Sequence, residues 1–203
     1  MAQEQAAIDD RAASVMHDDA ADLRDVRLAL DSHIDRERFE TPADRVSEAS
    51  LRRAFSMFPT GVVAMCAMDD GAPIGMTINS FTSVSLDPPL VSVCMARQSF
   101  TWSRLRRLPR IGLTVLGADQ EALSRQLAAR TGDRFSGIDF EVRPEGAVHI
   151  PGGTLWLDCS VRDRLDGGDH EIVLLEVKET TVFPHVKPLV YHQRHYLTLA
   201  PAS

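Results

Sequence analysis

From Pro59 onward the chain consists of short apolar runs separated by turn residues, a pattern typical of β-strands. The first run, residues 61–69, ends at Asp70-Gly71, a dipeptide that favours the tight turn of a β-hairpin. Three further runs follow after short breaks, at residues 73–77, 80–86 and 89–96. Because the breaks are short, we expect neighbouring strands to pair as a β meander.

Two helical patterns interrupt the strands in the second half of the chain. Residues 99–108 start with a serine cap and carry apolar side chains at helical spacing, and residues 118–131 show the same spacing. The remaining strand-like runs lie at residues 111–117, 154–165, 170–183 and 188–199. Such closely joined strands exclude alternating βαβ units. The sequence therefore predicts a mainly β fold with flanking helices, built as an antiparallel barrel that leaves few exposed strand edges.

The first 45 or so residues differ from the rest, since they are rich in Ala, Asp and Arg and contain no Gly. Apolar residues recur at helical spacing between Ala20 and Asp35, so this stretch is expected to be an amphipathic helix or a frayed tail. Thr41-Pro42 then predicts the start of a helix that continues through Phe58. We divide the chain into an N-terminal helical extension or tail, residues 1–47, and a main domain, residues 48–203.

Composition and charge narrow the possible roles. With 203 residues, of which 44% are hydrophobic, the chain can form one full core but not two large domains. The net charge of -7, without a long basic run, argues against nucleic acid or anionic membranes as partners. No apolar run reaches the roughly 20 residues that cross a bilayer, and the N-terminus lacks a signal-peptide core, so we expect a cytoplasmic protein. Cys66, Cys94 and Cys159 stand singly in apolar runs, as buried free thiols do.

The predicted strand at residues 80–86 is unusually rich in hydroxyl groups. Alternation would place Phe81, Ser83 and Ser85 on one face and Thr82, Val84 and Leu86 on the other. A buried hydroxyl without a partner costs about 1 to 3 kcal/mol, so something polar should meet the serine face. Thr77, Asn79 and Ser80, just upstream, would let a planar ligand approach the backbone closely. The alternative is a solvent-facing strand or hydroxyl ladders that satisfy one another.

A second polar cluster, residues 96–101, lies at the start of the first helix of the second half. A helix N-terminus presents unpaired N–H groups, so Arg97, Ser99 and Thr101 are candidates to hold a phosphate group. The alternative is an ordinary N-cap formed by Ser99. Together the two clusters predict a ligand with a flat hydrogen-bonding part and a phosphate.

Several motifs of other protein classes are missing from the sequence. Neither G-x-G-x-x-G after a strand nor G-x-x-x-x-G-K-S/T occurs, so we expect no Rossmann dinucleotide site and no P-loop. G-x-S-x-G is missing as well, so hydrolase chemistry has no support. His192 and His195 have a metal-like spacing, but residues three apart on an extended segment point to opposite faces. We therefore expect no metal site.

Four runs of the sequence, in order, resemble the flavin reductase family with the FMN-binding split barrel. The runs are Phe58-Pro-Thr-Gly-Val62, Gly75 to Leu90, Gly168-Asp-His170 and Pro188-Leu-Val-Tyr191. The resemblance covers about residues 48–199, and the long second run is its most specific part. It implies a homodimeric split β-barrel of antiparallel Greek-key type that passes hydride from NADH or NADPH to FMN or FAD. Such proteins are the reductase components of two-component systems and release reduced flavin to a flavin-dependent monooxygenase.

The resemblance also implies which residues meet the flavin. The flavin ring would be lined by Met76, Thr77, Ile78, Asn79, Ser80 and Ser83. The flavin phosphate would be held at Ala96, Arg97, Ser99 and Thr101, and Phe135 would lie near the flavin pocket. Phe135 could equally be a plain core aromatic. His170, in the Gly-Asp-His run, would place the nicotinamide, although a histidine in a surface turn is the alternative. Tyr191 and Tyr196 would either touch a cofactor or pack.

Two other functions remain open on the same fold. One is a non-catalytic protein that binds or stores flavin, because a fold does not determine a function. The other is a relative that oxidises a bound phosphorylated substrate, as pyridoxamine-phosphate oxidases do on a similar barrel. The intact run from Gly75 to Leu90 argues against the second, and His170 favours an enzyme over a storage protein.

Overall fold

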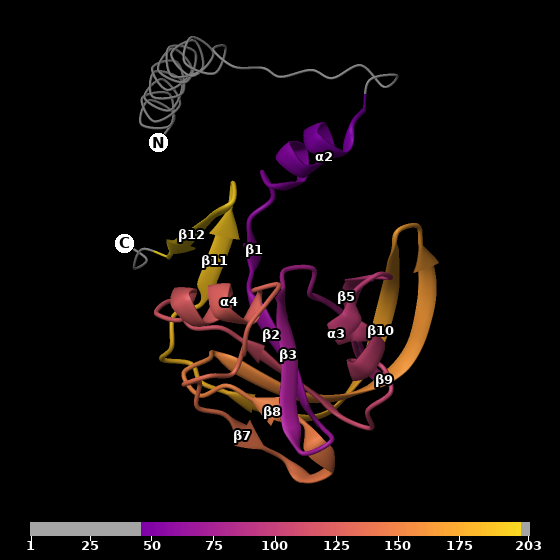
Figure 1. The fold of residues 1–203 in the computed structure, drawn as a ribbon, viewed down its shortest axis with the longest axis vertical. Coiled ribbons are helices and arrows are strands. Elements are labelled where there is room, and N and C mark those ends of the chain that lie inside the picture. Colours follow the sequence, from indigo (N-terminus) through magenta and orange to yellow (C-terminus); the bar gives the residue numbers. More distant parts are fainter. Residues whose placement is uncertain (1–45, 200–203) are drawn as a thin grey trace, which may run out of the picture. The chain divides into compact units, whose positions relative to one another are not determined.

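The computed structural model describes residues 46–199 (Figure 1). The chain divides into two compact units, residues 1–50 and 51–203. The helix expected between residues 20 and 35 and the Thr41-Pro42 cap lie outside the described residues. Helix α2 (Glu48–Phe55) is the first described element, and it ends three residues before the expected Phe58. The main-chain bonds from Met57 to Ala54 and from Phe58 to Phe55 have i-to-i−3 spacing, because Pro59 disfavours helical geometry at Phe58.

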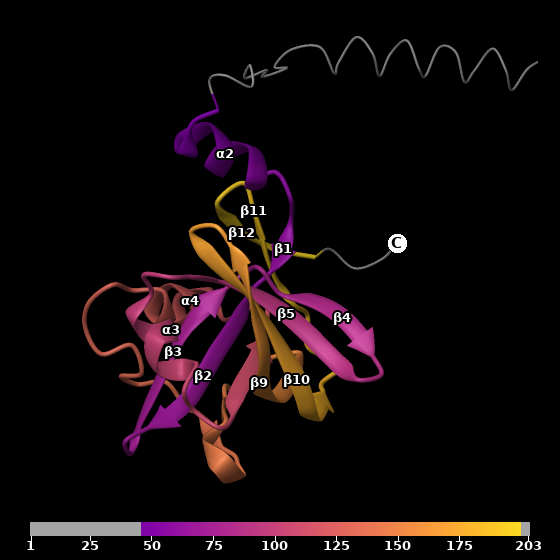
Figure 2. The same cartoon turned by 90° about the vertical axis from the view of Figure 1, so that its right-hand side faces the viewer.

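A seven-stranded antiparallel sheet forms the body of the fold, which confirms the expected mainly β class. Its strand order is β3-β2-β6-β9-β10-β5-β4, and Figure 2 shows β3 and β4 on opposite sides of the sheet. The bounds are β2 (Val63–Asp69), β3 (Ala72–Ile78), β4 (Thr82–Leu86), β5 (Pro89–Ala96), β6 (Ile111–Val115), β9 (Leu155–Gly167) and β10 (His170–Val182). Within residues 46–199 no ladder joins β3 to β4, so the pairing does not close a barrel.

Short elements cover the sheet. β1 (Thr60–Gly61), β11 (Leu189–His192) and β12 (His195–Thr198) form a small sheet, and β7 (Glu141–Val142) pairs with β8 (Val148–His149) around a 3-10 turn at Pro144–Gly146. The two helices are shorter than expected, α3 being Phe100–Leu105 and α4 being Glu121–Leu127. α4 starts late because the main-chain N–H groups of Gly117 and Ala118 bond to Gln120 Oε1 and the Lys187 oxygen. None of the described helices is both long and apolar enough to cross a membrane.

The turn between β2 and β3 has the geometry that the sequence predicts, but β4 departs from the predicted alternation of side chains. Asp70 and Gly71 have positive φ angles of 50° and 81°, as the hairpin between β2 and β3 requires. In β4 a bulge at Val84 interrupts the alternation: Ser83 pairs with Val91 and Ser85 with Leu90. Because Val91 and Leu90 are consecutive, Ser83 and Ser85 face opposite sides of the sheet. The predicted single hydroxyl face is therefore wrong.

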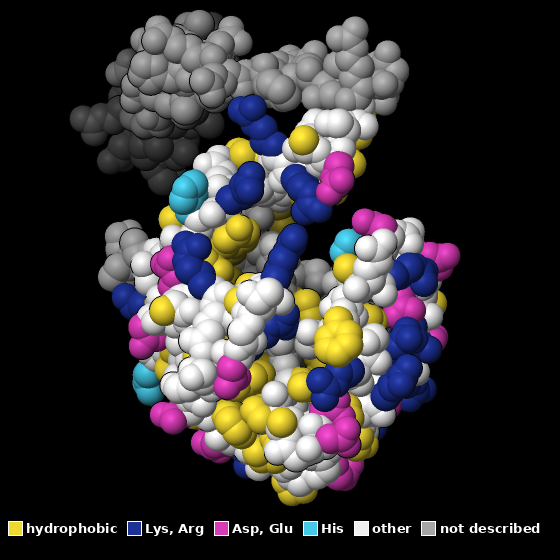
Figure 3. Space-filling model, viewed as in Figure 1, with side chains coloured by type: hydrophobic (Ala, Val, Ile, Leu, Met, Phe, Trp, Pro, Cys, Tyr) yellow, Lys and Arg dark blue, Asp and Glu magenta, His cyan; other side chains and the backbone are white. Residues whose placement is uncertain are grey.

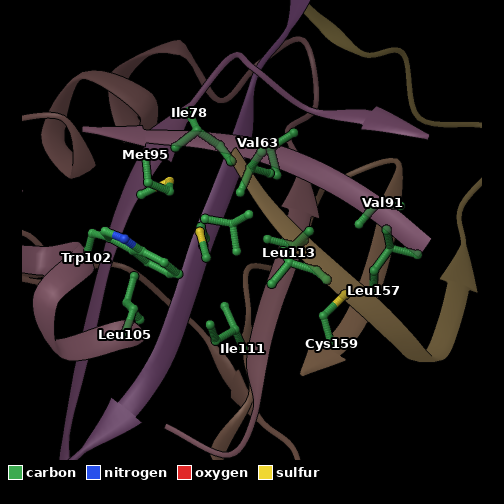
Figure 4. Close-up of a cluster of buried hydrophobic side chains, with 14 of the residues drawn as sticks. Val63, Ile78, Val91, Met95, Trp102, Leu105, Ile111, Leu113, Leu157 and Cys159 are labelled. Atoms are coloured by element: carbon green, nitrogen blue, oxygen red, sulfur yellow. The ribbon is translucent and has the colours of Figure 1, made fainter. Parts of the chain in front are cut away.

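The main core lies on one face of the sheet. Six of its strands supply apolar side chains to it, and Trp102 and Leu105 of α3 complete it (Figure 4). Met76 from β3 and Met95 from β5 reach this same core, although their strands lie far apart in the strand order. The sheet therefore curves around a shared interior.

A second apolar cluster lies on the opposite face of β2, where Leu127 of α4 and Leu189 of β11 cover it. Cys66 belongs to this cluster and Cys159 to the main core, and burial raises the pKa of each thiol to about 12. Both remain protonated and unreactive near neutral pH. Cys94 is exposed on β5, so the expectation of three buried thiols is wrong for this residue.

Candidate functional site

Strand β3 separates two surroundings because its side chains alternate between the sheet faces. Ile74, Met76 and Ile78 contact the main core. Thr77 faces the other way, and beside it lies a pocket of about 140 Å³. The pocket is lined by Val62, Thr77, Ile78, Asn79, Ser124, Tyr191 and Tyr196. Three of the residues predicted to line a flat ligand thus share one hollow; we call it the ring pocket.

The far wall of the ring pocket comes from α4 and from the C-terminal strand pair. Buried Ser124 accepts a hydrogen bond from the Thr77 hydroxyl on its main-chain oxygen, at 3.3 Å. Its own hydroxyl lies 2.9 Å from the Tyr196 phenol oxygen. The Tyr191 and Tyr196 rings pack with centroids 5.1 Å apart, and the Arg125 guanidinium lies 4.9 Å from the Tyr196 ring centre. The tyrosines therefore both pack and line the pocket.

A second pocket, of about 350 Å³, lies beside the other half of β3. It is bounded by residues 73–75 of β3, residues 100, 101 and 104 of α3, and the loop of residues 130–135. Arg134 Nη1 donates to the Thr101 hydroxyl at 2.9 Å and to the Gly75 main-chain oxygen at 3.1 Å. We call this hollow the arginine pocket. Figure 3 shows Lys and Arg side chains in the depression between α4 and α3 on this face.

The charges of the arginine pocket favour an anion. Arg104 forms an ion pair with Asp69 at 2.5 Å, which offsets its charge. For Arg130 and Arg134 no ion pair is present within the described part of the chain, although Asp133 also lines the pocket. Two cations beside a hydroxyl group and a helix start can receive a phosphate with charge-assisted hydrogen bonds. Thr101 lines this pocket beside Arg134, and its contact with a phosphate stays a prediction.

Ser99 is the N-cap of α3, which bears out the ordinary capping interpretation. Its hydroxyl accepts a hydrogen bond from the Trp102 main-chain N–H at 3.2 Å and lies 3.8 Å from the Met76 sulfur. Trp102 in turn donates from its indole nitrogen to Glu171 at 2.7 Å. This contact and nearby Arg164 and Arg106 lower the pKa of Glu171. A phosphate contact by Ser99 stays a prediction.

His170 lies at the first position of β10, opposite Ala96 at the last position of β5. Its Nδ1 is 2.8 Å from the Asp169 carboxylate, and this contact lowers the pKa of Asp169. Arg97 is engaged with the same turn, since its Nε donates to the Gly168 oxygen and its Nη2 to Asp166. His170 is 42% exposed, so its ring is accessible to a ligand.

The remaining predicted residues are spread around these pockets. The Ser80 hydroxyl bridges the main-chain N–H and oxygen of Cys94, at 2.9 and 3.2 Å, and so ties the end of β3 to β5. Ser83 is exposed beside Val91. Phe135 lines the arginine pocket and also packs edge-to-face on Phe140, with centroids 5.9 Å apart. The packing interpretation of Phe135 is therefore confirmed, and a role at a flavin pocket stays a prediction.

The reasoning about His192 and His195 needs correction. Gln193 and Arg194 have positive φ angles and form a tight turn, so the two histidines are paired across β11 and β12 instead of pointing apart. In residues 46–199 no group of three or more His, Cys, Asp or Glu side chains is placed to hold a metal ion.

Several pocket residues were missed at the sequence level. Ser124 lies in α4, which carried no motif, and Arg104 lies in α3 beyond the polar cluster of residues 96–101. Arg134 directly precedes Phe135, so its neighbour was a signal that could have identified it. Its role depends on a loop that returns to Thr101 from 33 positions away in the sequence.

Comparisons with known proteins agree with this geometry. Residues 55–200 match the model of the family described as flavin reductase like domain. The reductase subunit HsaB of a flavin-dependent monooxygenase from Rhodococcus jostii is 30% identical, over 78% of this chain and 82% of its own length. An NADH-dependent FAD reductase from Streptomyces globisporus is 38% identical, over 79% of this chain and 88% of its own length.

Solved structures extend the likeness to the fold. The NADH:FAD oxidoreductase SgcE6 of Streptomyces globisporus, solved in complex with NAD and FAD fragments, superimposes with a TM-score of 0.74. It is 37% identical in sequence, and the match covers 81% of this chain and 98% of that one.

Proposed function

Because the chain belongs to the flavin reductase like domain family, we propose that it is an NAD(P)H:flavin oxidoreductase that reduces FMN or FAD. The relatives named as NADH-dependent FAD reductases make NADH and FAD the first pair to test. The observation that carries the proposal is the pairing of two different pockets along one strand. A hydroxyl- and tyrosine-lined pocket lies beside Thr77, and an arginine pocket lies beside Gly75.

The spacing of the two pockets fits a flavin. Asn79 and Gly75 are four residues apart, which is about 13 Å along an extended strand. This separation suits a ligand with a flat hydrogen-bonding ring at one end and a phosphate at the other. Gly75 has no room for a side chain, since a Cβ there would lie 2.5 Å from the Cys66 sulfur. The Gly75 main-chain oxygen accepts a hydrogen bond from Arg134, so it would orient this guanidinium toward the phosphate end of the ligand.

The ring end would be held by residues 76–80. Thr77 and Asn79 offer polar side chains, and the main chain beyond β3 offers N–H groups at the pocket edge. The Thr77 hydroxyl donates to Ser124, so its lone pairs are left to accept a hydrogen bond from a ring N–H. Ser80 and Ser83, which follow β3, and Phe135, which lines the arginine pocket, complete the predicted set. The tyrosine wall limits water on one side of the ring.

The phosphate end would be held by Thr101 and Arg134, with Arg130 at the pocket rim. Ala96, Arg97 and Ser99 stay in the proposed site as the segment that leads from β5 into α3. Direct phosphate contacts from Arg97 and Ser99 would compete with the contacts that both already make. Thr101 is therefore the strongest hydroxyl candidate of the segment.

A flavin bound here would supply the two-electron acceptor for a nicotinamide hydride. His170 would orient the nicotinamide, since one ring nitrogen is held by Asp169 and the other remains for the carboxamide. Hydride transfer itself needs no protein acid, so the role of His170 is positional. We propose that reduced flavin leaves the site and supplies a flavin-dependent monooxygenase; relatives named as reductase subunits of a flavin-dependent monooxygenase and of stachydrine N-demethylase support this role.

Three further features belong to this proposal. The sharing of one core by β3 and β5 supports a split β-barrel of Greek-key type. Exposed apolar side chains such as Phe55, Phe58 and Leu86 support a homodimer, because a partner subunit would remove them from water. Residues 1–47 would form an extension outside the reductase domain of residues 48–203, in a cytoplasmic protein.

The proposal is tested by oxidation of NADH and NADPH with purified protein, measured without flavin, with FMN and with FAD. A reductase oxidises nicotinamide only when flavin is added, and the rate saturates with flavin. Flavin binding without oxidation of either nicotinamide would reject the enzyme and support the flavin-storage alternative. Placing the oxygenase and the reductase on opposite sides of a dialysis membrane would test whether reduced flavin diffuses between them.

A further inference from the structure

We propose that Arg97 is a positioning residue that holds the turn between β9 and β10, and through it His170, in place for the nicotinamide. This inference rests on the proposed function, because His170 has no nicotinamide to orient without it. It assigns Arg97 a different task from the phosphate contact that the sequence suggested.

Arg97 contacts three residues of this turn. Its main-chain N–H donates to the Asp169 oxygen at 3.1 Å, its Nε to the Gly168 oxygen at 2.8 Å, and its Nη2 to the Asp166 carboxylate at 2.7 Å. A guanidinium group suits this arrangement because its N–H donors are fixed in a planar fork. The pKa of Asp166 is lowered by the Gly168 main-chain N–H and by Arg97, so the carboxylate stays charged near neutral pH.

The turn depends on such contacts because little else supports it. Residues 162–169 are all exposed, and Figure 1 shows β9 and β10 extending as a curved ribbon. The ladder between β5 and β10 ends at the Ala96–His170 pair, one residue before Arg97. The turn therefore lies beyond the part of β10 that has a strand on both sides, and an exposed turn has few buried contacts that resist opening. Arg97, which directly follows β5, forms hydrogen bonds with the turn beyond the last paired residues of β5 and β10.

The position of His170 depends on this turn. Asp169, whose main-chain oxygen is held by Arg97, is also the residue whose carboxylate contacts His170 Nδ1. A carboxylate at Nδ1 favours the proton on that nitrogen, which leaves Nε2 directed away from Asp169. Holding residues 168 and 169 in place therefore favours one orientation of the His170 ring, with Nδ1 toward the Asp169 carboxylate.

The electrostatics argue against a phosphate at Arg97. Two carboxylates surround its guanidinium, Asp166 at 2.7 Å and Glu171 at 3.7 Å. A phosphate there would face both negative charges, whereas Arg134 in the arginine pocket has no ion pair within residues 46–199. The positive charge of Arg97 is already matched by the turn.

The inference is tested with Arg97→Gln and Arg97→Lys, and Arg162→Gln serves as a matched control. Arg162 is an exposed arginine of β9 that pairs with Glu176 at 3.0 Å and makes no contact with the turn. Amide hydrogen exchange of Gly168, Asp169 and His170 should accelerate about tenfold in Arg97→Gln, because two charge-assisted hydrogen bonds are lost. Arg97→Lys should recover only part of the protection, and Arg162→Gln should leave it unchanged.

Kinetics provide the second readout. In Arg97→Gln the KM for the nicotinamide should rise about tenfold, while the flavin dissociation constant stays within about twofold of the original value. In a His170→Ala background the Arg97→Gln change should raise KM no further, because Arg97 acts through His170. Weaker flavin binding with unchanged nicotinamide KM would overturn the inference and make Arg97 a phosphate ligand.

The two proposals fail in different ways. If the unmodified protein oxidises neither nicotinamide with any flavin, the proposed function fails, whatever happens at the turn. If amide exchange of residues 168–170 is unchanged in Arg97→Gln, the positioning role is rejected even when the reductase activity is confirmed.

Discussion

The phenol oxygen of Tyr196 lies 2.9 Å from the hydroxyl of Ser124, and this contact joins β12 to α4. The main-chain oxygen of Ser124 also accepts the Thr77 hydrogen bond, so one buried residue connects the C-terminal strand pair to β3. The walls of the ring pocket are thus held together by contacts between distant parts of the sequence.

Replacing Tyr196 with Phe should lower the free energy of unfolding by about 1 kcal/mol, because the buried Ser124 hydroxyl loses its partner. The double variant Tyr196→Phe with Ser124→Ala should be less destabilised than the sum of the single changes, since no unpaired hydroxyl remains. Urea unfolding followed by tryptophan fluorescence measures both. Tyr191→Phe is the control. If it lowers the free energy of unfolding as much as Tyr196→Phe does, the contact between Tyr196 and Ser124 contributes nothing specific.

Replacing Arg134 with Met should weaken flavin binding by about 1.5 to 3 kcal/mol, which is roughly 10- to 150-fold, because a charge-assisted contact to the phosphate is lost. Flavin fluorescence titration at two salt concentrations measures the affinity. The salt dependence should also fall in the variant, since one cation no longer contributes. Arg162→Met is the control, because it removes an equal charge from β9. Equal losses of flavin affinity in both variants would show that only the net charge of the protein matters, and not a contact between Arg134 and the phosphate.

Ser99 can be tested for capping and for phosphate contact separately. Ser99→Ala should cost about 1 kcal/mol of stability, because the Trp102 N–H loses its cap. Ser99→Asp should keep the cap and the stability, but its carboxylate would repel a nearby phosphate. Thermal unfolding and flavin titration distinguish the two effects. Unchanged flavin affinity in Ser99→Asp would place the phosphate away from Ser99.

His170→Ala should reduce kcat/KM for the nicotinamide about tenfold or more, while flavin affinity changes little, because the proposed role of this exposed ring is to orient the nicotinamide. His170→Gln, which retains a hydrogen-bond donor and acceptor, should recover part of the loss. Steady-state kinetics with varied nicotinamide and saturating flavin measure both variants. Turnover equal to that of the original protein in His170→Ala would leave His170 as an ordinary turn residue.

Buried His149 should make the fold sensitive to acid. Burial and nearby Arg143 lower the pKa of this residue to about 4, and its ring stacks on Trp156 with centroids 5.2 Å apart. In the unfolded chain His149 binds a proton near pH 6.5, whereas in the folded protein it binds one only near pH 4. Stability is therefore fully present above about pH 6.5 and falls by up to about 3 kcal/mol as the pH drops to 4.

Urea unfolding at several pH values measures this loss, and His149→Phe should flatten it because the aromatic stack remains without a titrating group. The exposed histidine of β12 provides a control, since His195→Gln should keep the original slope. An equal slope in His149→Phe would assign the acid sensitivity to carboxylates instead.

The alternation of apolar residues determined most of the strands, because a side chain that repeats every second position must face a core. It predicted the strands before and after Asp70-Gly71 and the long β9 and β10, and a serine before a helical pattern predicted the N-cap at Ser99. The prediction failed at Val84, because a bulge depends on how β4 pairs with β5 and does not change the alternation of residues in the sequence.

The sequence by itself also predicted a ligand site at Thr77, Asn79 and Thr101, because hydroxyl and amide groups in a strand or helix start need polar partners, and the structure places all three at pockets. Only the tertiary structure decided which other residues surround them. Arg134 reaches Thr101 from a loop, and Arg97 donates to Gly168 and Asp166 of the turn between β9 and β10. The physical reason is that the direction of a long charged side chain depends on which carboxylates and carbonyls folding brings within hydrogen-bond distance.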